Sequence, residues 1–191
     1  SLCEWMLNKQ LGKTEPKPEL QYYSHEMEEC ANGYVSYITE LLEDIKQHCK
    51  DPIVLVEQKL DFSKYVEEGF GTGDCVIVAD DVLHIIDYKH GKGVVVDSTN
   101  NPQMMLYALG ALELFDSLYE ISKISMTIYQ PRVANISTFE MSKEDLLKWA
   151  KEVLIPASKL AFDGKGNYCS GEWCRFCKAK HLCRERAKES M

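Results

Sequence analysis

The sequence predicts an α/β domain in which helices flank a mixed sheet. Three features indicate this fold: a long amphipathic helix within the first 50 residues, three closely spaced strand segments after it, and a later helix followed by one more strand. Apolar residues at three- and four-residue steps are typical of helices, whereas short β-branched runs between turn residues are typical of strands. With 191 residues, 45% of them hydrophobic, the chain is long enough to bury one such core.

The first 50 residues are expected to form two helices. The first spans residues 2–11 and ends before a loop in which two prolines prevent the helix from continuing. The second begins after Ser24, a residue type that favours the N-cap position, and runs to about residue 49. Its apolar residues mark one buried face: Val35, Ile38, Leu41, Leu42 and Ile45.

The middle of the chain is expected to form a three-stranded meander. Residues 53–60, 74–79 and 82–88 are rich in β-branched and apolar side chains. Asp80 and Asp81 separate the last two segments, which suits a tight hairpin. The three strands are therefore expected to pair in chain order.

The second half of the chain continues the pattern as helix, strand and helix. Pro102 suits the start of a helix that runs to about residue 117, and a strand is expected at residues 123–130. An amphipathic helix follows at residues 142–162. We expect the core and its N-terminal helices to occupy residues 1–163, and a cysteine-rich basic segment to occupy residues 164–191.

Charge is distributed unevenly along the chain. The formal net charge of −8 argues against a uniformly basic nucleic-acid coat. Between residues 173 and 188, however, a single acidic residue stands against six basic ones: Arg175, Lys178, Lys180, Arg184, Arg186 and Lys188. This segment is suited to meet phosphate groups.

The sequence contains no stretch of about 18 uncharged apolar residues and no basic-then-apolar leader. A cytoplasmic location is therefore expected. Ser1 is not a methionine, and the residues after it read like the middle of a helix, so we expect further residues upstream of it.

Two aspartates and a lysine are expected to meet at one end of the sheet. Asp87 and Lys89 are two residues apart in an extended segment, so their side chains share a face. Counting six residues outward from each side of the Asp80-Asp81 turn reaches Asp74 and Asp87, which places both carboxylates at the same end of the hairpin. Neighbouring carboxylates repel one another unless a cation lies between them, and their hard oxygen atoms suit Mg²⁺ or Mn²⁺.

Three motifs occur in an order that resembles the PD-(D/E)XK nuclease superfamily, and within it the RecB-like exonucleases of phage and prophage type. They read Gly71-Thr72-Gly73-Asp74, Ile85-Ile86-Asp87-Tyr88-Lys89 and Gln103-Met104-Met105-Leu106-Tyr107. The resemblance covers about residues 53–186. It implies a restriction-endonuclease-like core of α-β-β-β-α-β order that binds one or two divalent ions and cuts DNA.

The resemblance also implies roles for individual residues. Asp74 and Asp87 would be metal ligands, and Lys89 the catalytic lysine. Gln103 and Tyr107 lie four residues apart on one helical face, where they either contact nucleic acid or brace the site. Glu57, within the first strand, is either a further catalytic carboxylate or an ordinary strand glutamate.

RecB-like members place a metal-binding histidine on a helix ahead of the core. His25 is the candidate for this position, and the alternative is a histidine that precedes Ser1.

Four cysteines near the C-terminus predict a second metal site: Cys169, Cys174, Cys177 and Cys183. Four thiolates suit either a tetrahedral Zn²⁺ or an iron–sulfur cluster. The resemblance favours a 4Fe-4S cluster held by the last three of them, with Cys169 or a cysteine upstream of Ser1 as the fourth ligand. Cys3 and Cys30 are weaker candidates for that ligand, and a set of reduced thiols without metal is the alternative.

The leading hypothesis is a metal-dependent DNA exonuclease of phage recombination or DNA repair, which could act with a phage recombination partner protein. DNA would then contact the basic rim that includes Arg175 and Lys178. A second hypothesis is a catalytically inactive nucleic-acid-binding module with a structural cysteine-metal cluster. A third is a structure-specific endonuclease or resolvase on the same core.

Overall fold

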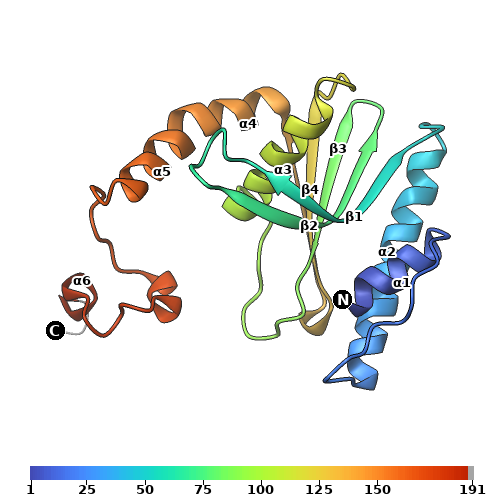
Figure 1. Cartoon of the computed structure of the whole chain (residues 1–191), viewed down its shortest axis with the longest axis horizontal. Coiled ribbons are helices and arrows are strands. Elements are labelled where there is room, and N and C mark those ends of the chain that lie inside the picture. Colours follow the sequence, from blue (N-terminus) through green and yellow to red (C-terminus); the bar gives the residue numbers. More distant parts are fainter. Residues whose placement is uncertain (189–191) are drawn as a thin grey trace.

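The computed structural model describes residues 1–188 as an α/β fold in which helices flank a five-stranded mixed sheet (Figure 1). The strands lie in the order β1 (Ile53–Asp61), β2 (Phe70–Ala79), β3 (Val82–Tyr88), β4 (Lys123–Gln130) and β5 (Asn135–Ser142). β3 and β4 are parallel, and the other neighbouring pairs are antiparallel. Parallel neighbours need a long crossover, which contains α3 (Pro102–Phe115). The predicted fold class is confirmed.

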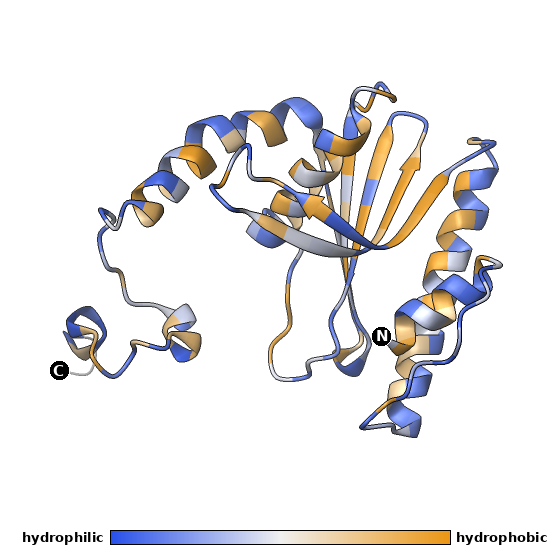
Figure 2. Ribbon diagram, in the orientation of Figure 1, coloured by the Kyte–Doolittle hydropathy of each residue, from blue (hydrophilic) through white to orange (hydrophobic). Residues whose placement is uncertain are grey.

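Helices cover the two faces of the sheet. α1 (Leu2–Gln10) and α2 (His25–Lys46) lie on one side, and α3 packs on the other (Figure 1). Each interface has its own apolar cluster, with β-strand side chains alternating between the two. Figure 2 shows that the central strands are the most hydrophobic part of the molecule, as expected for a sheet buried on both faces.

Side-chain caps set the starts of three helices, and Ser24, which the sequence indicates, is one of them. The Ser24 hydroxyl accepts a hydrogen bond from Met27 N at 3.2 Å, and the Asn101 side chain accepts from two amides at the start of α3. Ser142 caps α4 (Lys143–Trp149) by accepting from Asp145 N at 3.0 Å. The chain then continues through a π-helical turn (Ala150–Leu154) into α5 (Ile155–Phe162). The expected helix over residues 142–162 is therefore present, with a local change of winding.

Two of the five strands differ from the expectation. β2 begins at Phe70, four residues early, because Gly71 and Gly73 pair with β1 although glycine disfavours strands. β5 was not predicted at all. Its apolar residues Ile136 and Phe139 fall on opposite faces of an edge strand, so the sequence shows no regular apolar alternation there.

Residues 163–188 form two short helices, η3 (Glu172–Phe176) and α6 (Arg184–Lys188), joined by irregular segments. Figure 1 shows them apart from the sheet, beyond the end of α5. Large side chains stay exposed there: Tyr168, Trp173, Phe176 and Leu182. The division of the chain at residue 163 remains a prediction.

Within residues 1–188, no helix is both long and apolar enough to cross a membrane.

Candidate active site

The β2–β3 hairpin brings Asp74 and Asp87 together as predicted. Ala79 pairs with Val82 and Cys75 with Ile86, so the register leaves the two aspartates at the same end of the hairpin. The amide N–H of Tyr88 donates to Asp74 Oδ2 at 2.7 Å. Asp87 is almost fully buried, with 5% of its surface exposed.

Lys89 and Gln103 complete a polar network around Asp87. Lys89 Nζ lies 2.8 Å from Asp87 Oδ2 and donates to Gln103 Oε1 at 3.0 Å. The Gln103 amide donates to the Tyr107 hydroxyl at 3.0 Å and to Asp87 Oδ1 at 3.4 Å. Gln103 thus braces the lysine and the carboxylate, which was one of its two predicted roles. Contact of Gln103 or Tyr107 with nucleic acid remains a prediction.

Gly71 permits the close approach of Tyr107 to β2. A methyl group at this position would lie 2.5 Å from Cε1 of the Tyr107 ring. The first glycine of the Gly71-Thr72-Gly73-Asp74 motif therefore has a packing role, because a side chain there would displace the tyrosine that Gln103 contacts.

We expect Gly71→Ala to lower the free energy of unfolding by about 1 to 3 kcal/mol, since the added methyl overlaps the Tyr107 ring. Chemical denaturation would measure the change. Gly91→Ala is the matched control, because nothing lies within 4 Å of a methyl group there. Equal stability of the two variants would show that Tyr107 has room to move.

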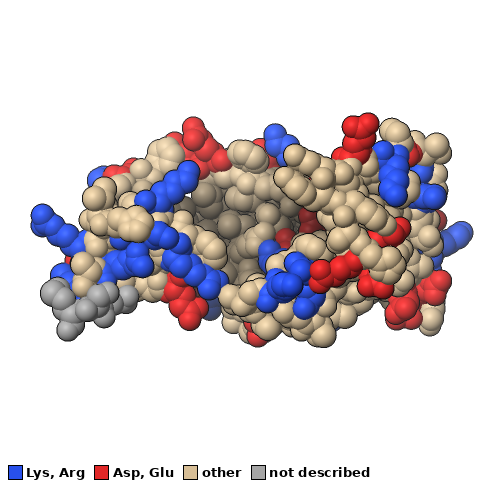
Figure 3. Space-filling model, turned by 90° about the horizontal axis from the view of Figure 1, so that it is seen from below, with Lys and Arg blue, Asp and Glu red and all other residues tan. Residues whose placement is uncertain are grey.

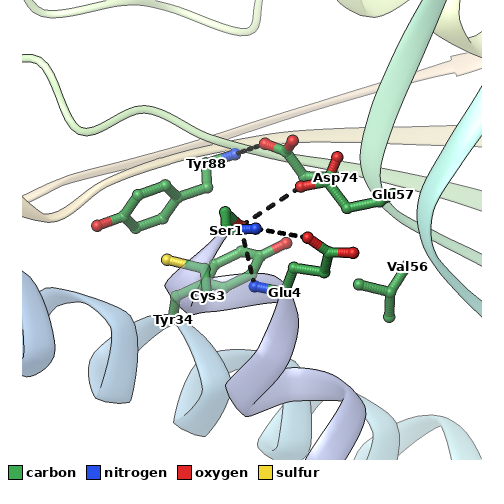
Figure 4. A pocket seen from close by; sticks show the side chains of 8 residues that line it. All are labelled: Ser1, Cys3, Glu4, Tyr34, Val56, Glu57, Asp74 and Tyr88. Atoms are coloured by element: carbon green, nitrogen blue, oxygen red, sulfur yellow. Dashed lines mark hydrogen bonds and ion pairs between the residues drawn. The ribbon is translucent and has the colours of Figure 1, made fainter. Parts of the chain in front are cut away.

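Glu57 faces the same site from β1 in an unusual backbone conformation. Its φ is +53°, in the left-handed region, although its neighbours Val56 and Gln58 pair regularly with β2. Such strain in a residue other than glycine is uncommon and concentrates at functional sites. Its carboxylate lies beside Asp74 and accepts a 3.4 Å hydrogen bond from the Ser1 hydroxyl (Figure 4).

Asp74 and Glu57 border a cavity of about 230 Å³ between the sheet and the N-terminal helices, whereas Asp87 and Lys89 do not line it. Figure 4 shows its lining side chains: Ser1, Cys3, Glu4, Tyr34, Val56, Glu57, Asp74 and Tyr88. Burial raises the pKa of the Cys3 thiol to about 11, so it is neutral at physiological pH. No sequence pattern places Tyr34 here, because it lies on the buried face of α2 and resembles a core residue.

The environment strongly favours the neutral form of Asp74. Burial is the main cause, followed by the negative charges of Asp87 and Glu57, while the Tyr88 amide and Lys89 oppose them. The pKa of Asp74 rises from 3.8 to about 7. A cation bound between these carboxylates would remove the repulsion.

A family comparison covers the whole chain. The family model described as protein of unknown function (DUF2800) matches residues 1–191. The chain belongs to the DUF2800 family. One solved structure, described as the crystal structure of SSO0001, is similar at 14% identity and a TM-score of 0.37, covering 97% of this chain and 95% of the other. A likeness at that level is too distant to assign a fold or a function.

The pKa of Asp74 gives this DUF2800 protein a testable pH dependence. The pKa of Asp74 is higher in the folded state than in the unfolded state, so protonation of Asp74 stabilises the fold. This stabilisation is fully present below pH 3.8 and is lost as the pH rises through 7. In EDTA at pH 8, Asp74→Asn should therefore be about 2 kcal/mol more stable than the wild type, roughly half the full effect of the shift because the side chain is partly solvated.

Urea unfolding at pH 8 and pH 4 would measure that difference, which should nearly vanish at pH 4. A stability gap independent of pH would contradict the raised pKa of Asp74.

His25 lies outside the carboxylate site of the DUF2800 chain. Its side chain is 82% exposed at the start of α2, and its Nδ1 atom lies 3.2 Å from Glu29 Oε1. It is absent from the cavity lining. The structure therefore does not bring the predicted histidine to Asp74 and Asp87.

The four C-terminal cysteines are not gathered into a metal-binding arrangement. Cys169 and Cys177 are exposed, Cys174 and Cys183 are partly buried, and none forms a disulfide. Among residues 1–188 no group of three or more His, Cys, Asp or Glu side chains is arranged to hold a metal ion. The cysteine cluster remains a prediction.

The predicted basic contacts Arg175 and Lys178 are both exposed. The Arg175 guanidinium lies over the Phe176 ring, 4.6 Å from its centroid. Seen from below, the molecule is hollowed between the C-terminal segment and the sheet domain, and Lys and Arg side chains gather on the C-terminal side of the hollow (Figure 3).

Proposed function

We propose that this protein is a metal-dependent nuclease that hydrolyses DNA phosphodiester bonds as an exonuclease in phage recombination or DNA repair. The observation that carries the proposal is the state of Asp87 Oδ2. This atom is buried, and it has no hydrogen-bond donor among the described residues, although Lys89 Nζ lies 2.8 Å away in an ion pair without hydrogen-bond geometry. A buried carboxylate oxygen without a hydrogen-bond donor keeps a lone pair with which it could bind a cation.

The donor set fits a hard divalent cation. Asp74 and Asp87 would hold Mg²⁺ or Mn²⁺, and Glu57 lies at the cavity wall as a third carboxylate. Mg²⁺ commonly takes only one or two protein carboxylates and completes its shell with water and phosphate oxygens, so two aspartates suffice. Such an ion lowers the pKa of bound water and stabilises charge on the phosphate oxygens.

Lys89 supplies the cationic group of the proposed reaction. It is 24% exposed, so its ammonium group is accessible to a substrate although it lies beside Asp87. The amide group of Gln103 accepts from Lys89 and fixes its position. A lysine held in this way can orient the attacking water or stabilise the transition state.

DNA would reach this site across the hollow in Figure 3. Residues 164–188 carry seven Lys and Arg residues against two glutamates, in a chain whose formal net charge is −8. Phosphate contacts of such a segment, with Arg175 and Lys178 among them, would supply affinity independent of sequence.

We also propose that the four C-terminal cysteines bind a 4Fe-4S cluster or Zn²⁺, which would order the exposed segment that carries these cations. A visible absorption spectrum of anaerobically purified protein, with metal analysis, distinguishes iron–sulfur, zinc and free thiols.

Comparing linear with covalently closed circular DNA tests the exonuclease assignment. In Mg²⁺ or Mn²⁺ the protein should degrade linear DNA and leave the closed circle intact, and EDTA should stop the reaction. Cutting of the closed circle would indicate an endonuclease, and retention of DNA without any cleavage would indicate a binding module.

A further inference from the structure

The aromatic ring of Tyr34 is well packed, but its hydroxyl group has no evident packing role. The side chain is 1% exposed on α2. Its ring makes edge-on contacts with Tyr88 and Tyr129, with centroids 5.2 and 5.5 Å away. A phenylalanine would make the same contacts, because they involve only the ring.

The Tyr34 hydroxyl is buried and has no hydrogen-bond partner among the described residues. Buried hydroxyl groups without partners are unfavourable, and those in native proteins are normally satisfied by protein, water or ligand. Tyr34 also lines the cavity that Asp74 and Glu57 border. Figure 4 shows its hydroxyl end directed into that cavity, on the side of the two carboxylates.

The cavity has room for a hydrogen-bond acceptor of the Tyr34 hydroxyl group. Its volume of about 230 Å³ has room for several water molecules. A protonated phenol donates one hydrogen bond, and oxygen atoms bound to a cation beside Asp74, the aspartate that lines the cavity, would be its acceptors. Such an oxygen belongs either to a bound water or to a phosphate group of the substrate.

We propose that Tyr34 is a positioning residue of the carboxylate site, whose hydroxyl donates a hydrogen bond to an oxygen atom held in the cavity beside Asp74. This inference rests on the proposed function, and it adds a residue from α2 to a site otherwise built from the sheet and α3. Tyr34 would hold that oxygen in place, without contributing a ligand to the cation.

Tyr34→Phe tests the inference, because it removes one oxygen atom and keeps the ring contacts. Tyr37→Phe is the matched control: Tyr37 lies one turn further along α2 and also packs on Tyr129, at 5.4 Å, but it does not line the cavity. In EDTA, the melting temperature of Tyr34→Phe should equal that of the wild type or exceed it by about 2 °C, since the lost hydroxyl has no partner there.

Two binding measurements then identify the oxygen. If it belongs to a metal-bound water, Tyr34→Phe should bind Mn²⁺ several-fold more weakly, as measured by electron paramagnetic resonance. If it belongs to a phosphate, Mn²⁺ binding should be unchanged, and binding of a DNA oligonucleotide in Ca²⁺ should weaken several-fold. In either case the cleavage rate should fall roughly ten- to a hundredfold, the usual effect of losing one hydrogen bond that supports a metal site without ligating the metal. Tyr37→Phe should match the wild type throughout.

Unchanged Mn²⁺ and DNA binding in Tyr34→Phe would overturn the inference, and so would a melting temperature several degrees below that of the wild type. If the wild type cleaves no DNA, the proposed function fails, and the two binding measurements still decide the role of Tyr34.

Discussion

Asp87→Asn should reduce metal-dependent DNA degradation at least about a thousandfold, equivalent to roughly 4 kcal/mol in the activation barrier. The substitution keeps the size of the side chain and an oxygen that can accept from Gln103, but it removes the charge from the carboxylate proposed to bind the cation. Because the substitution also removes the ion-pair partner of Lys89, rates should be measured below the melting temperature of the variant. Release of nucleotides from end-labelled linear DNA in Mn²⁺ would measure the loss.

Asp51→Asn is the matched control for this substitution, because Asp51 is an exposed aspartate just ahead of β1. It should degrade DNA at the wild-type rate. Comparable activity in Asp87→Asn and Asp51→Asn would show that Asp87 has no role in catalysis.

Lys89→Ala should lower the rate of DNA degradation about a hundred- to a thousandfold, the usual range for losing one preorganised group that stabilises a transition state. Lys89 is the cation held 2.8 Å from Asp87 and braced by Gln103, so its ammonium position is fixed before substrate arrives. Binding of DNA in Ca²⁺ should change only a few-fold, since Lys89 is one cation among many that phosphates can meet.

Lys92→Ala provides the comparison for that variant. Lys92 lies three residues further along the chain, is exposed, and forms no ion pair among residues 1–188. Its removal should leave the rate nearly unchanged. If both lysine variants slowed the reaction equally, the loss of rate would reflect a general effect of positive charge, and Lys89 would have no specific role. Rates should be measured below the melting temperature of each variant, because Lys89→Ala leaves Asp87 buried without its ion-pair partner.

Much of the site was predictable because it depends on short-range geometry. The two-residue turn at Asp80 and Asp81 fixes the register of the hairpin, and that register carries Asp74 to Asp87. The period of two in a strand then places Lys89 on the same face as Asp87. These relations involve residues within 15 positions of one another, where counting along the chain suffices.

The remaining features depend on contacts between distant parts of the chain. Tyr34 enters the cavity only because α2 packs across the face of the sheet that contains Cys75 and Ile86. The strained backbone of Glu57 lies between two residues that pair with β2, and no property of its residue type indicates a positive φ. Likewise, the pairing of β5 with β4 overrides its irregular apolar pattern.

The positions of His25 and the four C-terminal cysteines show the limits of motif spacing. Residue types and intervals suggested metal ligands in both places. In the structure, His25 is exposed beside Glu29, and the cysteines lie in a segment with no buried residue. Spacing along the chain restricts which side chains can meet, but packing against the core determines where a helix end or an irregular segment lies.

The most direct test of the central claim is a time course of end-labelled linear DNA with the purified protein, in Mg²⁺, in Mn²⁺ and in EDTA, with Asp87→Asn measured in parallel. The account predicts steady release of nucleotides by the wild type in at least one of the two metals, with none in EDTA or from the variant. Equal release by the wild type and Asp87→Asn, or no release by either in both metals, would contradict it.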